Sequence, residues 1–119
     1  MTSELVVYGI ANCDTVKRAR QWLQARELDH RFVDFKKTPP TDAQLHAWAQ
    51  RFGWQALVNT RGSTWRRLDA AQQAAVVDAD SAVQLLLRSP SAIKRPIVER
   101  GGQALLLGFD AAQWSTALS

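Results

Sequence analysis

The sequence predicts an α/β fold in which a β-α-β unit is followed by a helical middle and then by a β-β-α unit. Three observations carry this prediction. The apolar run Leu5–Tyr8 changes at once into a segment with helical spacing, and a second strand-like run ends at Phe35. The middle of the chain, 54–89, carries only short helical patterns. Near the end, Gly101-Gly102 separates two strand-like runs, as in a two-residue β-hairpin.

The composition is that of an ordinary globular protein with one modest core. The chain has 119 residues, of which 46% are hydrophobic and 22% are charged, and its net charge is +4. No block of five like charges is present, so we expect no nucleic-acid partner. No apolar run approaches the roughly 20 residues of a membrane span, and the N-terminus does not resemble a signal peptide. We therefore expect one domain over 1–119, no membrane association, and a monomer.

The first half of the chain reads as a parallel strand pair joined by a helix. Over 14–26, Val16, Ala19 and Leu23 recur on one helical face, while the basic residues between them can stay in water. The run Leu28–Phe35 then alternates like a strand. Two strands with a whole helix between them are typically parallel, because a short turn cannot connect parallel strands.

The middle and the end of the chain carry clear helix-start signals. Thr41 and Gln44 form a capping box after a Pro-Pro break, and Gly53 suits the end of that helix. At the C-terminus, Asp110 with Gln113 is expected to cap a helix that buries Trp114 and Leu118. The short helices of the middle are expected to begin at three capping residues: Ser63, Asp69 and Asp80.

The only cysteine, Cys13, falls where the first strand turns into the first helix. Unpaired backbone N–H groups and the positive end of the helix dipole favour thiolate over thiol there. The turn after a strand is also where open α/β folds expose their chemistry. The alternative is a small buried hydrophobe, the usual state of a free cysteine. The polar neighbours Asn12 and Asp14 favour the nucleophile.

The surroundings of Cys13 exclude several kinds of cysteine chemistry. A C-x5-R phosphatase loop needs arginine where Ala19 stands, and a C-x-x-C dithiol needs cysteine where Val16 stands. A cysteine hydrolase needs a histidine base, but His30 and His46 are both expected at the surface, with His46 opposite the inner face of its helix. A redox cycle at Cys13 therefore needs an external thiol, and glutathione is the cytosolic candidate. With one cysteine and no disulfide, a cytoplasmic location is expected.

Two arginines stand out from the scattered basic residues. Arg61 lies in the polar loop NTRGSTWRR, and Arg95 directly precedes Pro96 at the entrance to a predicted strand. An X-Pro bond at such a place can be cis and aim the preceding side chain. Arginines near a thiolate stabilise it and bind oxyanions or carboxylates as a fork.

Three segments, YGIANCDTVKRARQWL, LVNTRGSTWRRL and IKRPIVERGGQALLLGF, together resemble the ArsC/Spx arsenate reductase-like family, and most closely its YffB-type branch. The resemblance implies a thioredoxin-like fold with a mixed four-stranded sheet and a helical insertion at about 40–90. It places the reactive cysteine at Cys13, the site arginines at Arg61 and Arg95, and the cis-proline at Pro96, facing Cys13.

The chain also departs from two branches of that family. Arsenate reductases carry a further arginine near the end of the last strand, and the matching place, Leu107-Gly108, has none. The redox-switch regulators that bind RNA polymerase use a C-x-x-C pair, which Val16 interrupts. The alternatives to the leading hypothesis are a protein-binding regulator of the Spx type and a glutaredoxin-linked arsenate reductase.

The leading hypothesis is a glutathione-dependent thiol oxidoreductase in which Cys13 is the nucleophile. Glutathione is the co-substrate, the substrate is a small thiol adduct or oxyanion, glutaredoxin is a candidate partner, and no metal is expected. Arg61 and Arg95 are expected to bind anionic groups near Pro96. The residues expected to shape the loop or to add polar contacts are Asn12, Asp14, Thr15 and Lys17.

Overall fold

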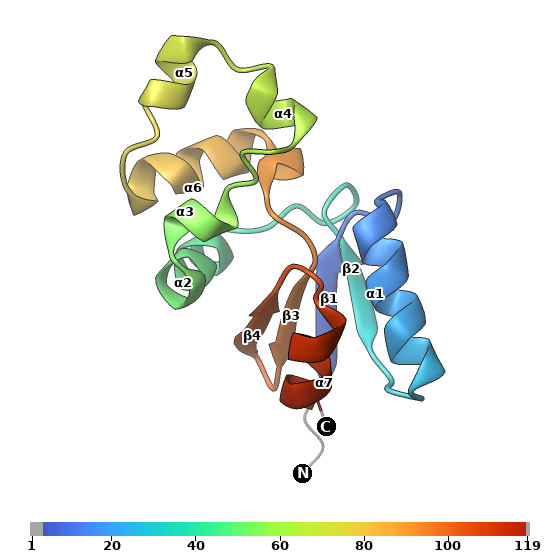
Figure 1. Cartoon of the computed structure of the whole chain (residues 1–119). Coiled ribbons are helices and arrows are strands. Elements are labelled where there is room, and N and C mark those ends of the chain that lie inside the picture. Colours follow the sequence, from blue (N-terminus) through green and yellow to red (C-terminus); the bar gives the residue numbers. More distant parts are fainter. Residues whose placement is uncertain (1–3, 119) are drawn as a thin grey trace. The chain divides into compact units, whose positions relative to one another are not determined.

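The computed structural model of the protein describes residues 4–118, which form two compact units (Figure 1). One unit, here called the sheet unit, comprises the chain up to Thr38 and again from Arg95 onward; the other, the helical unit, is Pro39–Lys94. The elements, in chain order, are β1 (Leu5–Gly9), α1 (Asp14–Ala25), β2 (Arg31–Asp34), α2 (Asp42–Phe52), α3 (Trp54–Leu57), α4 (Ser63–Arg66), α5 (Ala70–Ala74), α6 (Ala79–Arg88), the 3-10 helix η1 (Pro90–Ala92), β3 (Ile97–Arg100), β4 (Gln103–Leu107) and α7 (Ala111–Leu118).

The sheet unit contains the predicted mixed four-stranded sheet. The strand order is β2-β1-β3-β4, with β1 parallel to β2 and the other two pairs antiparallel. All five residues of β1 are buried, as expected of a central strand covered on both faces. The hairpin between β3 and β4 turns at Gly101 and Gly102, whose φ angles are +58° and +81°. Both values lie in the left-handed region that glycine adopts at low cost, so the predicted two-residue hairpin is confirmed.

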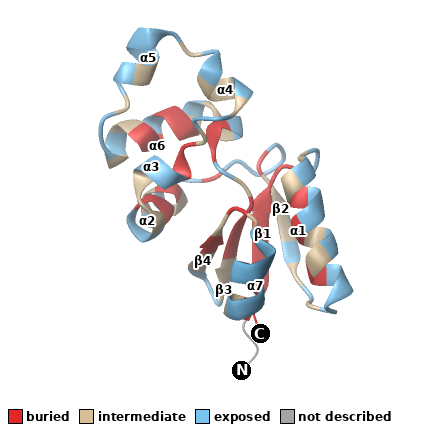
Figure 2. Cartoon of the chain, viewed as in Figure 1, coloured by how far each residue is buried: buried red, intermediate tan, exposed pale blue. Residues whose placement is uncertain are grey.

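The main core of the sheet unit lies between one face of the sheet and the two helices α1 and α7. Ala19 and Leu23 of α1 and Trp114 and Leu118 of α7 are buried there, as the helical spacing predicts. Trp114 is completely buried, and its indole N–H donates to the carbonyl oxygen of Gly108 at 3.0 Å. Figure 2 shows that the buried residues of the sheet are concentrated in β1 and at the start of β3, whereas β2 has none. The aromatic ring and its satisfied donor thus fix α7 on the sheet.

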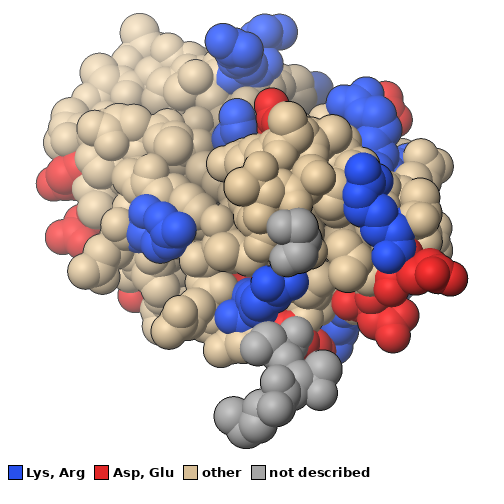
Figure 3. Space-filling model, turned by 60° about the horizontal axis from the view of Figure 1, so that its bottom comes forward, with Lys and Arg blue, Asp and Glu red and all other residues tan. Residues whose placement is uncertain are grey.

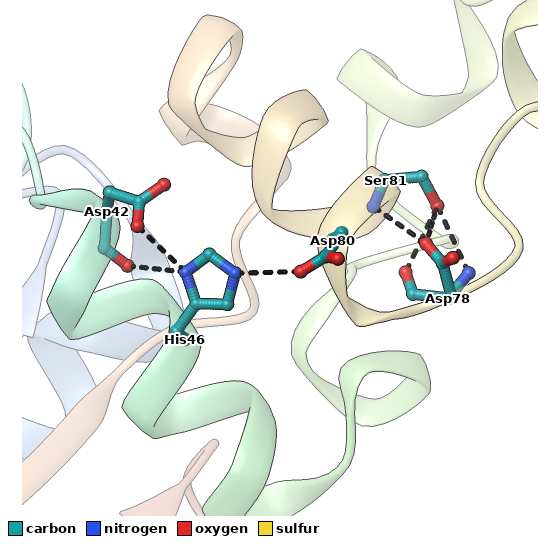
Figure 4. Close-up of polar contacts among 5 residues, drawn as sticks. All are labelled: Asp42, His46, Asp78, Asp80 and Ser81. Carbon is teal, nitrogen blue, oxygen red and sulfur yellow. Dashed lines mark hydrogen bonds and ion pairs between the residues drawn. The ribbon is translucent and has the colours of Figure 1, made fainter.

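The helical unit confirms two of the predicted capping boxes and corrects two expected caps. Thr41 and Asp69 each cap their helix reciprocally with the glutamine three residues on. Ser63 is not a cap, because Gly62 precedes α4 and Ser63 is already its first helical residue. Asp80 is not a cap either. Asp78 is the cap instead. Its carboxylate accepts the Ser81 N–H at 2.8 Å, and the Ser81 hydroxyl oxygen accepts the Asp78 N–H at 3.1 Å (Figure 4).

The carboxylate of Asp80 instead takes part in a bridge between α2 and α6 (Figure 4). The Nδ1 atom of His46 lies 2.9 Å from Asp42 Oδ1, and its Nε2 atom lies 3.1 Å from Asp80 Oδ1. Only the doubly protonated imidazolium can donate to both carboxylates at once. The helical spacing puts His46 on the outer face of its helix. The side chain is half-exposed, but it links two helices through this bridge.

A close contact between β1 and α1 sets the position of the turn that carries Cys13. A Cβ atom at Gly9 would lie only 2.8 Å from Cγ2 of Val16, which is fully buried in the first turn of α1. Valine is stiff about χ1, so Val16 cannot easily turn away. Glycine at position 9 therefore permits the helix to start this close to the end of the strand.

Replacing His46 with glutamine should lower stability at acidic pH and matter little at alkaline pH. The hydrogen bond with the Asp80 carboxylate, followed by that with the Asp42 backbone, raises the pKa of His46 above its ordinary value of 6.5. A group whose pKa is raised by folding binds more protons in the folded state than in the unfolded state. Its stabilisation is therefore complete below the unfolded-state pKa of 6.5 and is lost as the pH rises through the folded-state pKa. Urea unfolding of both proteins over a pH series measures the difference.

Asp80→Asn is the matched control for this pH dependence. It removes the leading cause of the raised pKa and should therefore abolish most of the pH-dependent difference caused by His46. A loss of stability in His46→Gln that is independent of pH, or that grows as the pH rises, would contradict the bridge.

Replacing Gly9 with alanine should lower the free energy of unfolding by about 1–3 kcal/mol, the usual cost of overpacking a well-filled core. The reason is the 2.8 Å contact that the new methyl group would make with Val16. Urea unfolding measures the loss. In the double variant with Val16→Ala the clash is gone, so its loss should be smaller than the sum of the two single losses. Strict additivity would show that the contact does not constrain this turn.

Candidate functional site

Cys13 occupies the N-cap of α1, directly before the first helical residue, Asp14. Its backbone is extended, with φ −135° and ψ 123°, and its carbonyl oxygen accepts the Lys17 N–H at 2.9 Å. Its thiol is free and half-buried, and Cys13 is not one of the buried core residues. α1 has 12 residues, so the thiol sits at the positive end of a full helix dipole. The prediction that Asn12 or Cys13 opens the helix is met by Cys13.

The neighbours of Cys13 form a polar, solvent-accessible turn. Asn12, Asp14 and Lys17 are exposed, and Thr15 is half-buried. The Thr15 hydroxyl is 3.5 Å from a guanidinium nitrogen of Arg18. Val16 alone points into the core among the first residues of the helix. The turn therefore leaves the side of the cysteine open to solvent while its helix is anchored behind it.

Arg95 and Pro96 belong to the same end of the sheet as the Cys13 turn. β3 is antiparallel to β1, and Tyr8 pairs with Ile97, the residue that follows Pro96. The start of β3 therefore lies beside the end of β1, from which the chain continues to Cys13. The Arg95–Pro96 peptide bond is cis, as the resemblance implies. Pro96 is buried, and its carbonyl oxygen accepts the Gly108 N–H at 2.8 Å.

Arg95 is half-buried, and its Nε atom is shielded from solvent. The planar fork of a guanidinium matches a carboxylate, so Arg95 is a candidate for binding one. Cys13, Arg95 and Pro96 are thus placed at one end of one sheet by strand pairing within the sheet unit.

Arg61 lies in the helical unit, at the start of a turn built by Asn59. The Asn59 side-chain oxygen accepts the Arg61 N–H at 3.2 Å, and its carbonyl oxygen accepts the Gly62 N–H at 3.3 Å. Asparagine commonly organises a turn in this way. The guanidinium-bearing residue is exposed, so it is available to an anion. Its membership of a site with Cys13 stays a prediction.

The root of the Arg61 turn is joined to the segment that precedes Arg95. Val58 forms a bridge with Ile93, the Asn59 N–H donates to the Ala92 carbonyl at 2.8 Å, and the Lys94 N–H donates to the Leu57 carbonyl at 2.8 Å. The role of Asn59 in organising this loop was not predicted from the sequence. The signal was its place directly before Thr-Arg-Gly, which is a turn-forming combination.

Figure 3 shows Lys and Arg side chains on one face in several separate groups, with Asp or Glu beside some of them.

Among residues 4–118, no cluster of three or more His, Cys, Asp or Glu side chains could hold a metal ion. No helix in the described part of the chain is long and apolar enough to cross a membrane.

Comparison with known proteins supports this reading of the fold. Residues 8–117 match the family described as the ArsC family. An uncharacterized protein of Haemophilus influenzae is 39% identical over 116 residues, which are 97% of this chain and 99% of that protein.

Two solved structures are similar over nearly the whole chain. The YFFB (PA3664) protein superposes with a TM-score of 0.90 at 41% identity, covering 97% of this chain and 99% of that one. An arsenate reductase (ArsC) related protein from Brucella melitensis superposes with a TM-score of 0.76 at 38% identity, covering 98% and 95%. The chain therefore belongs to the ArsC family and has its thioredoxin-like fold.

Proposed function

We propose that this protein is a glutathione-dependent thiol oxidoreductase with Cys13 as its single nucleophile. The observation that carries the proposal is the place of Cys13: a half-open thiol at the N-terminus of a full-length helix, at the sheet end where Arg95 and Pro96 enter β3. Membership in the ArsC family supports redox chemistry at this turn. The cytoplasm, with its reducing glutathione pool, is the compartment that suits it.

The first step is a thiol–disulfide exchange. The Cys13 thiolate attacks the glutathione sulfur of a mixed disulfide between glutathione and a substrate thiol. A bond forms between Cys13 Sγ and that sulfur, the substrate–glutathione S–S bond breaks, and the substrate leaves as a thiolate that takes up a proton. The attacking sulfur belongs to the residue that caps the N-terminus of α1. Cys13 is then joined to glutathione.

The second step needs a thiol from outside the chain, because Val16 occupies the place of a resolving cysteine and Cys13 is the only cysteine. The thiolate of a second glutathione attacks the glutathione sulfur of the adduct. Cys13 leaves as a thiolate and oxidised glutathione is released. Overall, the mixed disulfide and one reduced glutathione are converted into the substrate thiol and oxidised glutathione. Glutaredoxin is a candidate for the second reductant.

The arginines would supply the anion recognition that glutathione requires. Glutathione carries two carboxylates, and the guanidinium of Arg95 or Arg61 can bind one in a bidentate manner. Asn12 and Asp14 would shape the rim of the turn, and Thr15 and Lys17 would add polar contacts at the helix start. Pro96 would limit the approach of glutathione to the side of the sulfur.

Arsenate reduction is the second candidate, and the description of the Brucella melitensis protein as arsenate reductase related is what favours it. Against it stands the end of β4, where an additional arginine is expected in arsenate reductases. Gly108 there is buried with a φ of +75°, a conformation that an arginine would adopt only with strain. Turnover of arsenate with glutathione and glutaredoxin is the assay that separates the two candidates.

The third candidate function is that of a regulator of the Spx type, which binds RNA polymerase. It would not need the thiol, so capture of a stoichiometric partner that is unchanged by Cys13→Ser would favour it over the enzyme.

Treatment with oxidised glutathione should add one glutathionyl group to the protein, on Cys13. The single half-exposed thiol is the only acceptor in the sequence, and its helix position favours attack. Intact-mass spectrometry followed by peptide mapping measures the adduct, and reduced glutathione should remove it. Cys13→Ser is the control and should stay unmodified. A wild-type protein that remains unmodified under conditions that modify free cysteine would contradict the proposal.

Replacing Arg95 or Arg61 with glutamine should raise the KM for glutathione by about tenfold or more. A hydrogen bond to a charged group is worth about 1.5–3 kcal/mol, and about 1.4 kcal/mol corresponds to a factor of ten. Steady-state kinetics with a glutathione mixed disulfide measures the effect. The matched controls are Arg100→Gln at the far end of β3 and Arg66→Gln in α4, which should leave KM unchanged. Equal effects of test and control variants would assign the change to net charge alone.

A further inference from the structure

The strongest unassigned feature of the sheet unit is a groove along the outer edge of β2. β2 is the first strand in the sheet order, and among residues 4–118 no strand pairs with its outer side. A groove of about 480 Å³ lies beside this edge. The lining residues that matter are three cations, one carboxylate and two apolar side chains: Arg20, Arg31, Lys37, Asp34, Phe32 and Val33.

The backbone of β2 presents hydrogen-bonding groups to this groove. The Phe35 N–H donates to the Gly9 carbonyl at 2.8 Å, so the peptide groups of residue 35 point toward β1. In a strand of a parallel pair, the backbone N–H and C=O groups of every second residue point to the same neighbour. The peptide groups of Phe32 and Asp34 therefore point away from β1. The Asp34 carbonyl is occupied by the turn that follows the strand. The Phe32 N–H and C=O and the Asp34 N–H therefore remain for an incoming strand.

The charges along the groove are positive on balance. The guanidinium of Arg20 lies 4.2 Å from the centroid of the Phe32 ring, and its Nε donates to His30 Nε2 at 3.2 Å. These two contacts fix Arg20, and its Nη groups are the ones that can meet a ligand. Arg31 forms an ion pair with Glu4 at 2.9 Å, in which both side chains are 61% exposed. An exposed pair of this kind is weak and exchanges readily for another carboxylate.

We propose that the outer edge of β2 binds an extended, acidic segment of a partner protein by β-strand addition. Main-chain hydrogen bonds to Phe32 and Asp34 would give the pairing, and acidic side chains would meet Arg20, Arg31 and Lys37. Charged edges commonly protect a sheet against self-association. Here the same positive charges that repel a second copy of this chain are complementary to an acidic strand. Ala11, two residues before Cys13, also lines the groove, so a bound segment would pass beside the cysteine turn.

The test uses a fluorescein-labelled peptide, Glu-Val-Glu-Val-Glu-Val-Glu, and the Cys13→Ser protein, so that its outcome is independent of the thiol chemistry. Fluorescence anisotropy should show saturable binding that weakens with added salt. In NMR spectra, the amides of Phe32 and Asp34 should shift on titration. The double variant Arg31→Glu with Lys37→Glu should bind at least about tenfold more weakly, because two attractions become repulsions.

Three controls make the test decisive. The double variant Arg66→Glu with Arg67→Glu changes the net charge equally at exposed positions of the helical unit and should bind normally. The same peptide with methylated backbone nitrogens keeps its charge but cannot pair as a strand, and it should bind at least about tenfold more weakly. The corresponding lysine–valine peptide should not bind.

Any one of four results would overturn the proposal. These are no saturable binding of the acidic peptide, equal binding of the methylated peptide, equal losses in the two double variants, and a dimer of the protein that the peptide disrupts.

Discussion

The antiparallel pairing of β1 with β3 is the constraint on which the rest of this structure depends. β1 is buried on both faces and paired on both edges, with β2 on one side and β3 on the other. Because β3 is antiparallel to β1, the end of β1 lies beside the beginning of β3. The turn with Cys13 and the Arg95–Pro96 pair are neighbours at one end of the sheet for this reason alone. The chemistry proposed for the chain is thus a consequence of strand direction.

The packing of α1 and α7 on one face of the sheet supports this arrangement from behind. Trp114 is buried between them and makes edge-to-face contacts with Trp22 and Phe109 at centroid distances of 5.8 and 4.9 Å. Aromatic contacts of this geometry add stability beyond the area that they bury. A helix that is held firmly along its length can present its first turn, and the thiol on it, in a constant orientation. The packing along α1 therefore fixes the position of Cys13, the proposed nucleophile.

Much of the fold could be predicted because its signals are local. The change from apolar run to helical spacing places Cys13 at a helix start, Gly101-Gly102 specifies the hairpin, and Thr41 with Gln44 specifies a cap. The cap at Asp78 was missed although Ser81 stands three residues after it. A hydroxyl at that position closes the box as an amide does, whereas Val83, three residues after the predicted cap Asp80, has no group that could close it.

The parts that escaped prediction depend on contacts between distant segments. The bridge from His46 to Asp80 joins two helices, and no spacing within either helix indicates it. The groove beside β2 is likewise formed by a helix and a strand whose relative placement only the folded sheet fixes. Sequence alone could nominate Arg61 and Arg95 as anion-binding residues. Strand pairing accounts for the position of Arg95, whereas Arg61 is carried by the other unit and its partner depends on how the units associate.

The insertion of the helical unit between β2 and β3 has a consequence for synthesis on the ribosome. β1, α1 and β2 emerge first, but one edge of β1 stays without its neighbour until the whole of Pro39–Lys94 has been made. A central strand with one unpaired edge is prone to aggregation, since its free backbone groups can pair with other nascent chains. The helical unit is a compact unit by itself, so its folding can shorten the loop that must close. The compactness of the helical unit therefore favours the pairing of β3 with β1 once β3 has been synthesised.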